Sequence, residues 1–382
     1  MGKTLCSRLR GLSAAGAFAL ALALYAIPFA PFAAQAPAKP GNGKPWVAPR
    51  TPDGHPDLQG NWSNETQTPL ERMGNQGPTL TDEQAAALEK RAQDVEEFRD
   101  RPSDPGEIAT KGGGSELAPV PGEPTFVERI AQAAGGAVGG YNGFWLDPGN
   151  KVIRIDGVAR SSIIVDPPDG RIPALTAEAK QRAAERMAMV KKFGEFDHVE
   201  LRSLGDRCIT SFGSNAGPPM LPNYFYNNNY TIVQTKDHVM IMTEMVHDVR
   251  IIRLGAAQHG PSQVRPWFGD SIGRWEGDTL VIETTNIHPT QLAQSGFSPY
   301  RGGSEKLKVT ERLTRTGPDV LLYKFTVEDP STFTAPYSGE LPFNRVNEMI
   351  HEYACHEGNY ALPGMLAGAR EQERTQTEPK KP

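Results

Sequence analysis

Apolar and polar residues alternate over much of the C-terminal half of the chain, which is the pattern of half-buried β-strands. Most connections between the runs are short and carry turn residues such as Lys236, Asp237 and Gly277. Short links join antiparallel neighbours, because a parallel crossover needs about a dozen residues or more. Eight strands would leave two exposed edges unless the sheet closes. The pattern therefore predicts a mainly β fold, an antiparallel up-and-down barrel of the calycin or lipocalin type, with strands near 230–235, 238–244, 249–254, 272–276, 278–285, 305–314, 320–328 and 346–355.

The regions outside these strands read differently. Residues 39–143 form a Pro/Gly-rich, irregular arm with one helix over 82–99, where Thr81 and Asp82 provide a cap. We assign the barrel domain to residues 144–370, with an inserted helix at 176–192 that lies on the outside. "KVIRID" and "SSIIVDPPDGRIP" are expected to pair as a hairpin. Residues 371–382 are expected to be a disordered tail.

The first 38 residues have the composition of an export signal. Three basic residues, Lys3, Arg8 and Arg10, precede an apolar run over 11–24 and an Ala/Pro-rich stretch to Ala38. Cleavage is expected within 34–39. No later stretch holds about 18 consecutive apolar residues, so no transmembrane segment is expected in the mature chain. The sequence therefore predicts an exported protein, periplasmic or extracellular.

Cysteine content and charge narrow the picture further. Without the signal, Cys208 and Cys355 are the only cysteines, and exported proteins fold where thiols oxidise. We expect them to form a disulfide, with two free buried thiols as the alternative. The formal net charge is −5, and no Lys/Arg stripe follows the signal, so nothing indicates nucleic-acid binding.

The stretch "HEYACHEGN" places two histidines and a cysteine within residues 351–359. His351 and His356 are five positions apart, not the four of the H-E-x-x-H zinc motif. On a helix the two rings would stand roughly 140° apart, and on a strand they would face opposite sides. We therefore expect no metal here, and a disulfide-anchored last strand with His351 and Tyr353 facing inward.

Glu311 is a charged residue at an inward position of its strand. In "EKLKVTERLT" it shares one face with Leu307, Val309 and Leu313. A carboxyl desolvated among these residues should have a raised pKa, which is how a fold makes a general acid. Pairing with an arginine, for instance Arg250 or Arg253, is the competing structural interpretation.

"EMVHD" concentrates Glu244, His247 and Asp248 at a strand end and turn. A histidine beside a carboxylate can act as a general base near neutral pH. The alternative is that a polar turn needs polar residues. If the barrel closes, this turn, Glu311 and His351 are expected to line one cavity.

Aromatic residues supply the candidate ligand contacts. The long segment 211–230 contains Tyr224 and Tyr226, and loops of this length often cover sites. We assign Tyr224, Tyr226, Trp275 and Glu244 to ligand binding, although the same loop could plug one barrel end. "GDSIG" matches G-x-S-x-G, but Gly277 and Asp278 leave no room for the helix that this motif requires, so Ser271 is interpreted as part of a turn.

Six blocks of the sequence resemble a known group: "PDGHPDLQGNW", "SSIIVDPPDGRIPALT", "DHVMIMTEMVHDVRIIRL", "GDSIGRWEGDTLVIETTN", "LLYKFTVEDPSTFTAPY" and "EYACHEGNY". They are similar to the signature blocks of a large family of exported proteins of unknown function from soil bacteria. The resemblance runs from about residue 51 to residue 370. It implies export and a shared fold, and it supplies no activity and no catalytic residues.

These expectations combine into a functional hypothesis. The chain is interpreted as an exported, cofactor-independent hydrolase or lyase for a small aromatic or apolar molecule, since no nucleotide fingerprint or P-loop is present. Glu311 would be the acid and His247 or His351 the base, with Tyr353 and Asp248 orienting them. The alternatives are a non-catalytic periplasmic carrier of an apolar ligand, and a structural envelope protein whose arm, residues 39–80, binds a partner.

Overall fold

The computed structural model describes residues 46–99, 125, 127–128, 147–194, 196–211, 217–292 and 302–377. These residues belong to one compact unit, Trp46–Pro382. The predicted export signal and its cleavage position lie outside the described residues.

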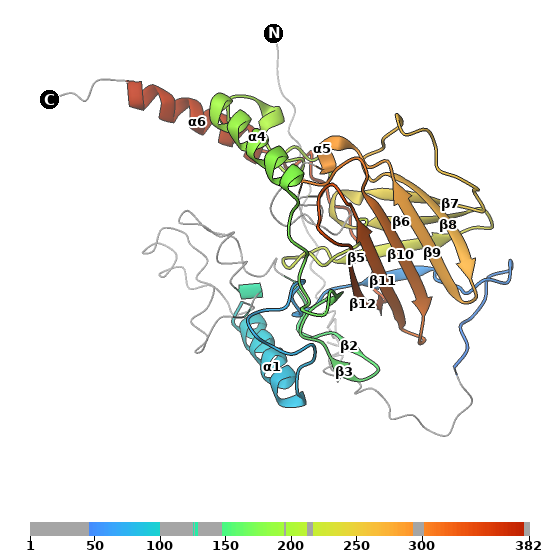
Figure 1. Ribbon diagram of the computed structural model, residues 1–382. Coiled ribbons are helices and arrows are strands. Elements are labelled where there is room, and N and C mark those ends of the chain that lie inside the picture. The colour runs from blue at the N-terminus through green and yellow to red at the C-terminus, as the bar shows by residue number, and fades with distance from the viewer. Residues whose placement is uncertain are drawn as a thin grey trace, which may run out of the picture. The chain divides into compact units, whose positions relative to one another are not determined.

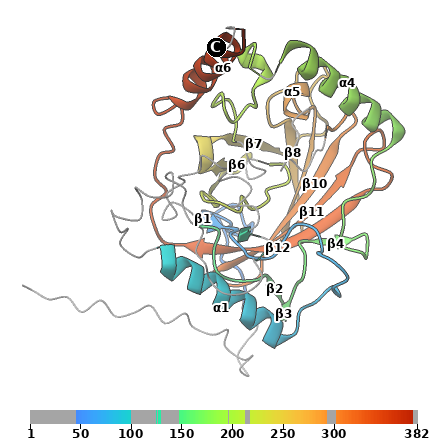
Figure 2. The same ribbon diagram turned by 90° about the vertical axis from the view of Figure 1, so that its left-hand side faces the viewer.

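A closed, mainly antiparallel β-barrel forms the centre of the fold (Figures 1 and 2). Eight of its strands follow one another in sequence order, and most of the connections between them are short. The ninth, β1, pairs with both β5 and β12 and closes the wall. The barrel strands are β1 (Gly60–Ser63), β5 (Asn229–Gln234), β6 (His238–Thr243), β7 (Val249–Leu254), β8 (Asp270–Glu276), β9 (Thr279–Thr285), β10 (Lys308–Arg315), β11 (Val320–Glu328) and β12 (Tyr337–Val346).

The purely antiparallel, up-and-down arrangement is not what the structure shows, because β7 and β8 run parallel. Their register extends only from Ile252 opposite Ser271 to Leu254 opposite Gly273. The connection, residues 255–269, is long enough for a parallel crossing, which needs about a dozen residues or more. Where the connections are short, the neighbouring strands are antiparallel, as predicted. The connection between β9 and β10, residues 286–307, is also long, and those two strands are antiparallel.

The predicted last strand, 346–355, is wrong. The last barrel strand is β12, which ends at Val346, and residues 351–354 have no regular structure. β12 contains Gly339 and Pro342, two residues that weaken strand signals in a sequence. A Cβ at Gly339 would clash with Cζ of Phe325, so this glycine leaves space for the buried ring.

The N-terminal arm also differs from its prediction, since it supplies the closing strand β1, too short at four residues to stand out in sequence. The expected hairpin is wrong as well. "KVIRID" pairs through β2 (Arg154–Ile155) with β3 (Val158–Ala159), and β4 (Ile164–Asp166) pairs with β12 instead. The β2–β3 hairpin turns at Asp156 and Gly157, both with positive φ, so an Asp-Gly turn signal was present in the sequence and was missed. The β4–β12 pairing joins segments far apart in the chain, and no local pattern indicates it.

Both predicted helices are present. α1 (Asp82–Arg99) buries Ala85 against Val152 and Ala159, beside the β2–β3 hairpin (Figure 1). α4 (Ala177–Phe193) begins after Thr176, whose side chain accepts a hydrogen bond from the Ala179 N–H. The other helical elements are α5 (Pro289–Leu292), α6 (Ala361–Thr377), and the 3-10 turns Val199–Leu201 and Met245–His247. Residues 371–377, expected in a disordered tail, belong to α6.

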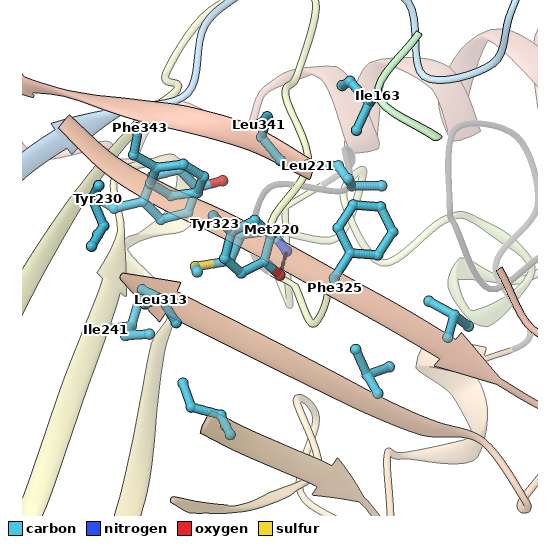
Figure 3. Packing of buried hydrophobic residues seen from close by; sticks show 14 of the residues in the cluster. Ile163, Met220, Leu221, Tyr230, Ile241, Leu313, Tyr323, Phe325, Leu341 and Phe343 are labelled. Atoms are coloured by element: carbon cyan, nitrogen blue, oxygen red, sulfur yellow. Dashed lines mark hydrogen bonds between the residues drawn. The ribbon is translucent and has the colours of Figure 1, made fainter. Parts of the chain in front are cut away.

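The interior of the barrel is filled by large apolar side chains (Figure 3). Tyr230 and Phe343 pack with ring centroids 5.1 Å apart. Met220 and Leu221, from the long loop before β5, are buried in the same cluster, and the Met220 N–H donates to the Tyr323 hydroxyl at 2.9 Å. This part of the loop therefore plugs the barrel, which is the second of the two interpretations given for it.

Candidate functional site

A cleft of about 590 Å³ opens where β7 and β8 separate. Residues 249–251 of β7 precede the part of the strand that pairs with β8, and they form one wall. Residues 266–271, including Trp267, form the opposite wall, and the remaining lining includes His247, Asp248 and His356. The parallel pair thus leaves an opening in the barrel wall, and polar side chains gather around it.

Asp248 is the chemically distinctive residue of this cleft. Its Oδ2 accepts a hydrogen bond from the Ser211 N–H at 3.2 Å, and among the described residues it takes part in no ion pair. Burial raises the pKa of Asp248 to about 7, and the hydrogen bond from Ser211 opposes that shift only in part. A carboxyl with this pKa can both accept and donate a proton near neutral pH.

The turn that carries His247 and Asp248 has an unusual backbone. Val246 has φ 61° and His247 has φ 47°, two successive non-glycine residues in the left-handed region. This conformation is costly for a β-branched residue and is found most often at functional sites. The turn buries Met245 and Val246 and leaves His247 exposed at the edge of the cleft.

The predicted disulfide between Cys208 and Cys355 is confirmed, with Cα atoms 5.7 Å apart. Cys208 lines the cleft, and the residue after Cys355, His356, lies in it too. The segment around Cys208 also carries Ser211, the hydrogen-bond donor to Asp248. The disulfide therefore ties the C-terminal segment and the environment of Asp248 together.

Behind the cleft, Glu311 sits in a buried ion pair with Arg250. Arg250 Nη1 and Nη2 donate to Glu311 Oε2 and Oε1, each at 2.8 Å, and the Tyr323 hydroxyl donates to Oε1 at 2.8 Å. Glu311 is fully buried and Arg250, which lines the cleft, is 4% exposed. Burial, with the Glu311 charge next in importance, raises the pKa of Tyr323 well above its usual range.

This geometry corrects the expected environment of Glu311. The strand pattern placed it correctly among inward residues, but it does not stand alone among apolar neighbours, because Arg250 engages both carboxyl oxygens. The competing interpretation, pairing with Arg250, is confirmed. A carboxylate held this way fixes the position of the Arg250 guanidinium.

A second polar cluster borders the same wall. Asp270 accepts hydrogen bonds from Arg253 at 2.8 Å and from the Gly260 N–H at 2.7 Å, and His259 bridges Asp270 and Glu283. Burial works to raise the pKa of Asp270, but the donors Gly260, Arg253 and His259 outweigh it, so the pKa is lowered. This cluster fixes the long connection between β7 and β8.

Ser271 is buried, and its hydroxyl pairs with that of Thr284 at 2.8 Å. It lies within strand β8 and not in a turn. The side chain has no helix behind it and is not presented as a nucleophile.

Several predicted site residues lie elsewhere. His351 is exposed and outside any strand, so its expected inward position is wrong, and Tyr353 is half-buried in the same irregular segment. Glu244 accepts from Asn229 Nδ2 at 2.9 Å. Tyr224 is buried and donates to the Thr68 carbonyl oxygen. Tyr226 packs near Phe225, and Trp275 stacks on His55 at 4.8 Å between centroids.

Of the predicted catalytic residues, His247 and Asp248 therefore line one cleft, and Glu311 lies behind Arg250, which also lines it. Sequence reasoning gave no site role to Trp267, His356 or Tyr323, and it named Arg250 only as a possible partner of Glu311. His356 could have been found from its neighbour Cys355, since a disulfide to Cys208 carries it toward the segment that precedes Ser211. Alternation in β11 places Tyr323 on an apolar face with Leu321, Phe325 and Val327, which indicates burial, but nothing in that pattern indicates its hydrogen bond to Glu311.

Within the described ranges, no three His, Cys, Asp or Glu side chains are grouped so that they could hold a metal ion. No helix in those ranges combines the length and the apolar character needed to cross a bilayer.

Compared with models of known protein families and with curated proteins, the chain matches none.

Proposed function

We propose that this protein is an exported acid/base enzyme that hydrolyses or eliminates a bond in a small, partly aromatic molecule bound in the β7–β8 cleft. Asp248 is its proton-transfer group, and His247 is its exchange partner at the solvent edge. The observation that carries the proposal is the convergence of Asp248, His247 and His356 on one cleft. The disulfide supports folding in an oxidising compartment.

Asp248 is suited to proton transfer because of its surroundings. It is partly buried and accepts one backbone hydrogen bond, and no described cation pairs with it. Its pKa of about 7 keeps both protonation states populated at neutral pH. The exposed ring of His247 can then return the proton to solvent.

The chemistry follows from one carboxyl that acts twice. As a base, Asp248 takes a proton from an attacking water, or from the carbon next to the one that bears the leaving group. In the first case the water oxygen forms the new bond and the leaving group departs with its electron pair. In the second case the C–H electrons form the new double bond, and the leaving group departs from the neighbouring carbon with the electron pair of the bond that breaks. The protonated carboxyl then gives its proton to the leaving group or, through His247, to solvent.

The cleft walls indicate the substrate class. Trp267 packs against His288 at 4.1 Å between ring centroids and lines the cleft with Phe268. Aromatic walls favour a flat or apolar body. Arg250 also lines the cleft, but Glu311 neutralises it, so the site does not require a strongly anionic substrate.

The alternative of a carrier has less support. A carrier of the lipocalin type holds its ligand inside the barrel, and this interior contains Met220, Leu221, Tyr230 and Phe343 packed together (Figure 3). The cleft that is lined by ionisable side chains lies in the barrel wall, between β7 and β8, and not in that interior.

The test compares three variants on a panel of chromogenic aryl esters, lactones and β-substituted aromatic acids. We expect Asp248→Asn to lower turnover about a hundredfold or more, and His247→Gln to lower it about tenfold. His238→Gln is the matched control, since His238 is exposed on β6 and does not line the cleft.

The pH profile is the second readout. The catalytic rate should show a transition near the Asp248 pKa of about 7, which Asp248→Asn removes. Turnover that survives Asp248→Asn with an unchanged pH profile rejects the proposal.

A further inference from the structure

A second, larger groove lies away from the β7–β8 cleft, along α4. It has a volume of about 1240 Å³ and extends along the helix from Glu178 to Lys191. At 1.5 Å per residue this is a length of about 20 Å. The opposite wall is formed by Pro289, Leu292 and residues 302–306.

The helix wall of this groove is apolar and poorly covered. Ala183, Met187 and Val190 are spaced so that they share one side of α4, and all three line the groove. Met187 is 73% exposed and Met189 is 44% exposed. Only Ala179 of α4 is buried. Unbranched, polarisable methionine side chains adapt to ligands of varied shape.

Charge along the groove is unbalanced. Glu178 and Arg182 form an ion pair at 2.7 Å, and Glu305 lies 3.3 Å from Arg265. Arg186, Lys191 and Lys306 also line the groove, and among the described residues no carboxylate forms an ion pair with them. Three positive charges therefore face an apolar channel whose lining carboxylates are already engaged.

We propose that this groove binds an amphipathic anion with a single long alkyl chain, that is, a free long-chain carboxylate. The chain would lie along Ala183, Met187 and Val190, and the carboxylate would meet Arg186, Lys191 and Lys306. The groove is about 20 Å long, which suits an extended apolar chain. Its volume also exceeds the usual upper range of about 1,000 Å³ for sites that hold compact ligands. The inference does not depend on the activity proposed for the cleft.

The test uses isothermal titration calorimetry of the purified full chain with dodecanoate, dodecanol and dodecylammonium at low salt. We expect saturable binding of dodecanoate, weaker binding of dodecanol and the weakest binding of dodecylammonium. Added salt should weaken only the dodecanoate interaction, because screening acts on the charge contacts.

Two sets of variants separate the head from the chain of the ligand. Arg186→Gln, Lys191→Gln and Lys306→Gln together should weaken dodecanoate about two- to fivefold per removed charge and leave dodecanol unchanged. Met187→Ser with Met189→Ser should weaken both ligands. Lys180→Gln, Lys192→Gln and Lys236→Gln together form the control, which removes the same charge from exposed residues that do not line the groove.

Three outcomes would overturn the inference. The protein could fail to bind dodecanoate, it could bind dodecanol and dodecanoate with equal affinity, or the groove variants could leave the affinities unchanged. Binding to phosphatidylglycerol vesicles without binding of monomeric dodecanoate assigns the surface to a membrane instead. Urea unfolding of each variant identifies any that fail to fold, and single substitutions then replace the combined ones.

Discussion

Two carboxyls of this barrel, one fully and one partly buried, have opposite surroundings. Glu311, on β10, is fully buried and holds Arg250 through both oxygens. Asp248, just before β7, is less buried and accepts only a backbone N–H among the described residues. Two positions in the chain separate Asp248 from Arg250, the partner of Glu311.

The difference teaches that burial alone does not create a proton donor. Burial raises the pKa of a carboxyl, and a nearby cation lowers it again. At Asp248, where no described cation pairs with the carboxyl, burial dominates and raises the pKa to about 7. The better buried carboxyl is therefore the structural one, and the partly exposed carboxyl is the reactive candidate.

The largest expected effect comes from removing the disulfide. Changing both Cys208 and Cys355 to Ala should lower the free energy of unfolding by about 5 kcal/mol on the chain-entropy estimate for a long loop. It should also loosen the segment that carries Ser211, so the pKa of Asp248 should fall toward its ordinary value. Urea unfolding and NMR titration of the carboxyl measure the two effects. A stable variant with an unchanged Asp248 pKa would show that the disulfide does not control the cleft.

Glu311→Gln should cost about 3–5 kcal/mol of stability, because it leaves the Arg250 charge buried without its counter-charge. The double variant Arg250→Met/Glu311→Leu should recover most of this loss, since replacing both partners removes the buried charge. Chemical denaturation of both variants decides the point. A single variant that loses less than about 1 kcal/mol would contradict the assignment of a structural ion pair.

Tyr323→Phe should cost about 2 kcal/mol, because Glu311 loses a hydrogen bond to its charged oxygen and the Met220 N–H loses its acceptor. A double-mutant cycle with Glu311→Gln should show that the two costs are not additive, as expected for one network. Additive costs would mean that the hydroxyl and the carboxylate act independently.

The smallest effect concerns the pH dependence of stability. The folded-state pKa of Asp248, about 7, lies above its unfolded value of about 4, so protonation of Asp248 stabilises the fold at low pH. This contribution is lost as pH rises through 7. Asp248→Asn should therefore flatten the dependence of the unfolding free energy on pH. As pH rises from 5 to 8, the unfolding free energy of the variant should increase by about 1–2 kcal/mol relative to that of wild type, a value reduced to allow for the partial solvent access of Asp248.

Asp237→Asn, at an exposed turn between β5 and β6, is the control for the general effect of removing one negative charge. If the two Asn variants give the same pH profile, Asp248 is not desolvated.

The barrel wall could be predicted from the sequence better than the site could. Alternation placed Val309, Glu311 and Leu313 on the buried side of β10, because side chains on a strand must face alternate sides, and Leu307, just before the strand, is buried with them. The same rule failed at His351, where no strand forms. Trp267 and His356 reach the cleft only through the β7–β8 crossing and the disulfide, which no local period encodes.

By itself, the sequence determined the hairpins β5–β6, β6–β7, β8–β9 and β10–β11, the capped helices α1 and α4, and the pairing of Cys208 with Cys355. These follow from local periods, turn chemistry and a count of two thiols. Only the tertiary structure decided that β1 closes the barrel, that β7 and β8 run parallel, and that Arg250 meets Glu311 and not Asp248. The reason is physical: a partner across the barrel is chosen by strand register and closure, and these depend on contacts among segments far apart in the chain.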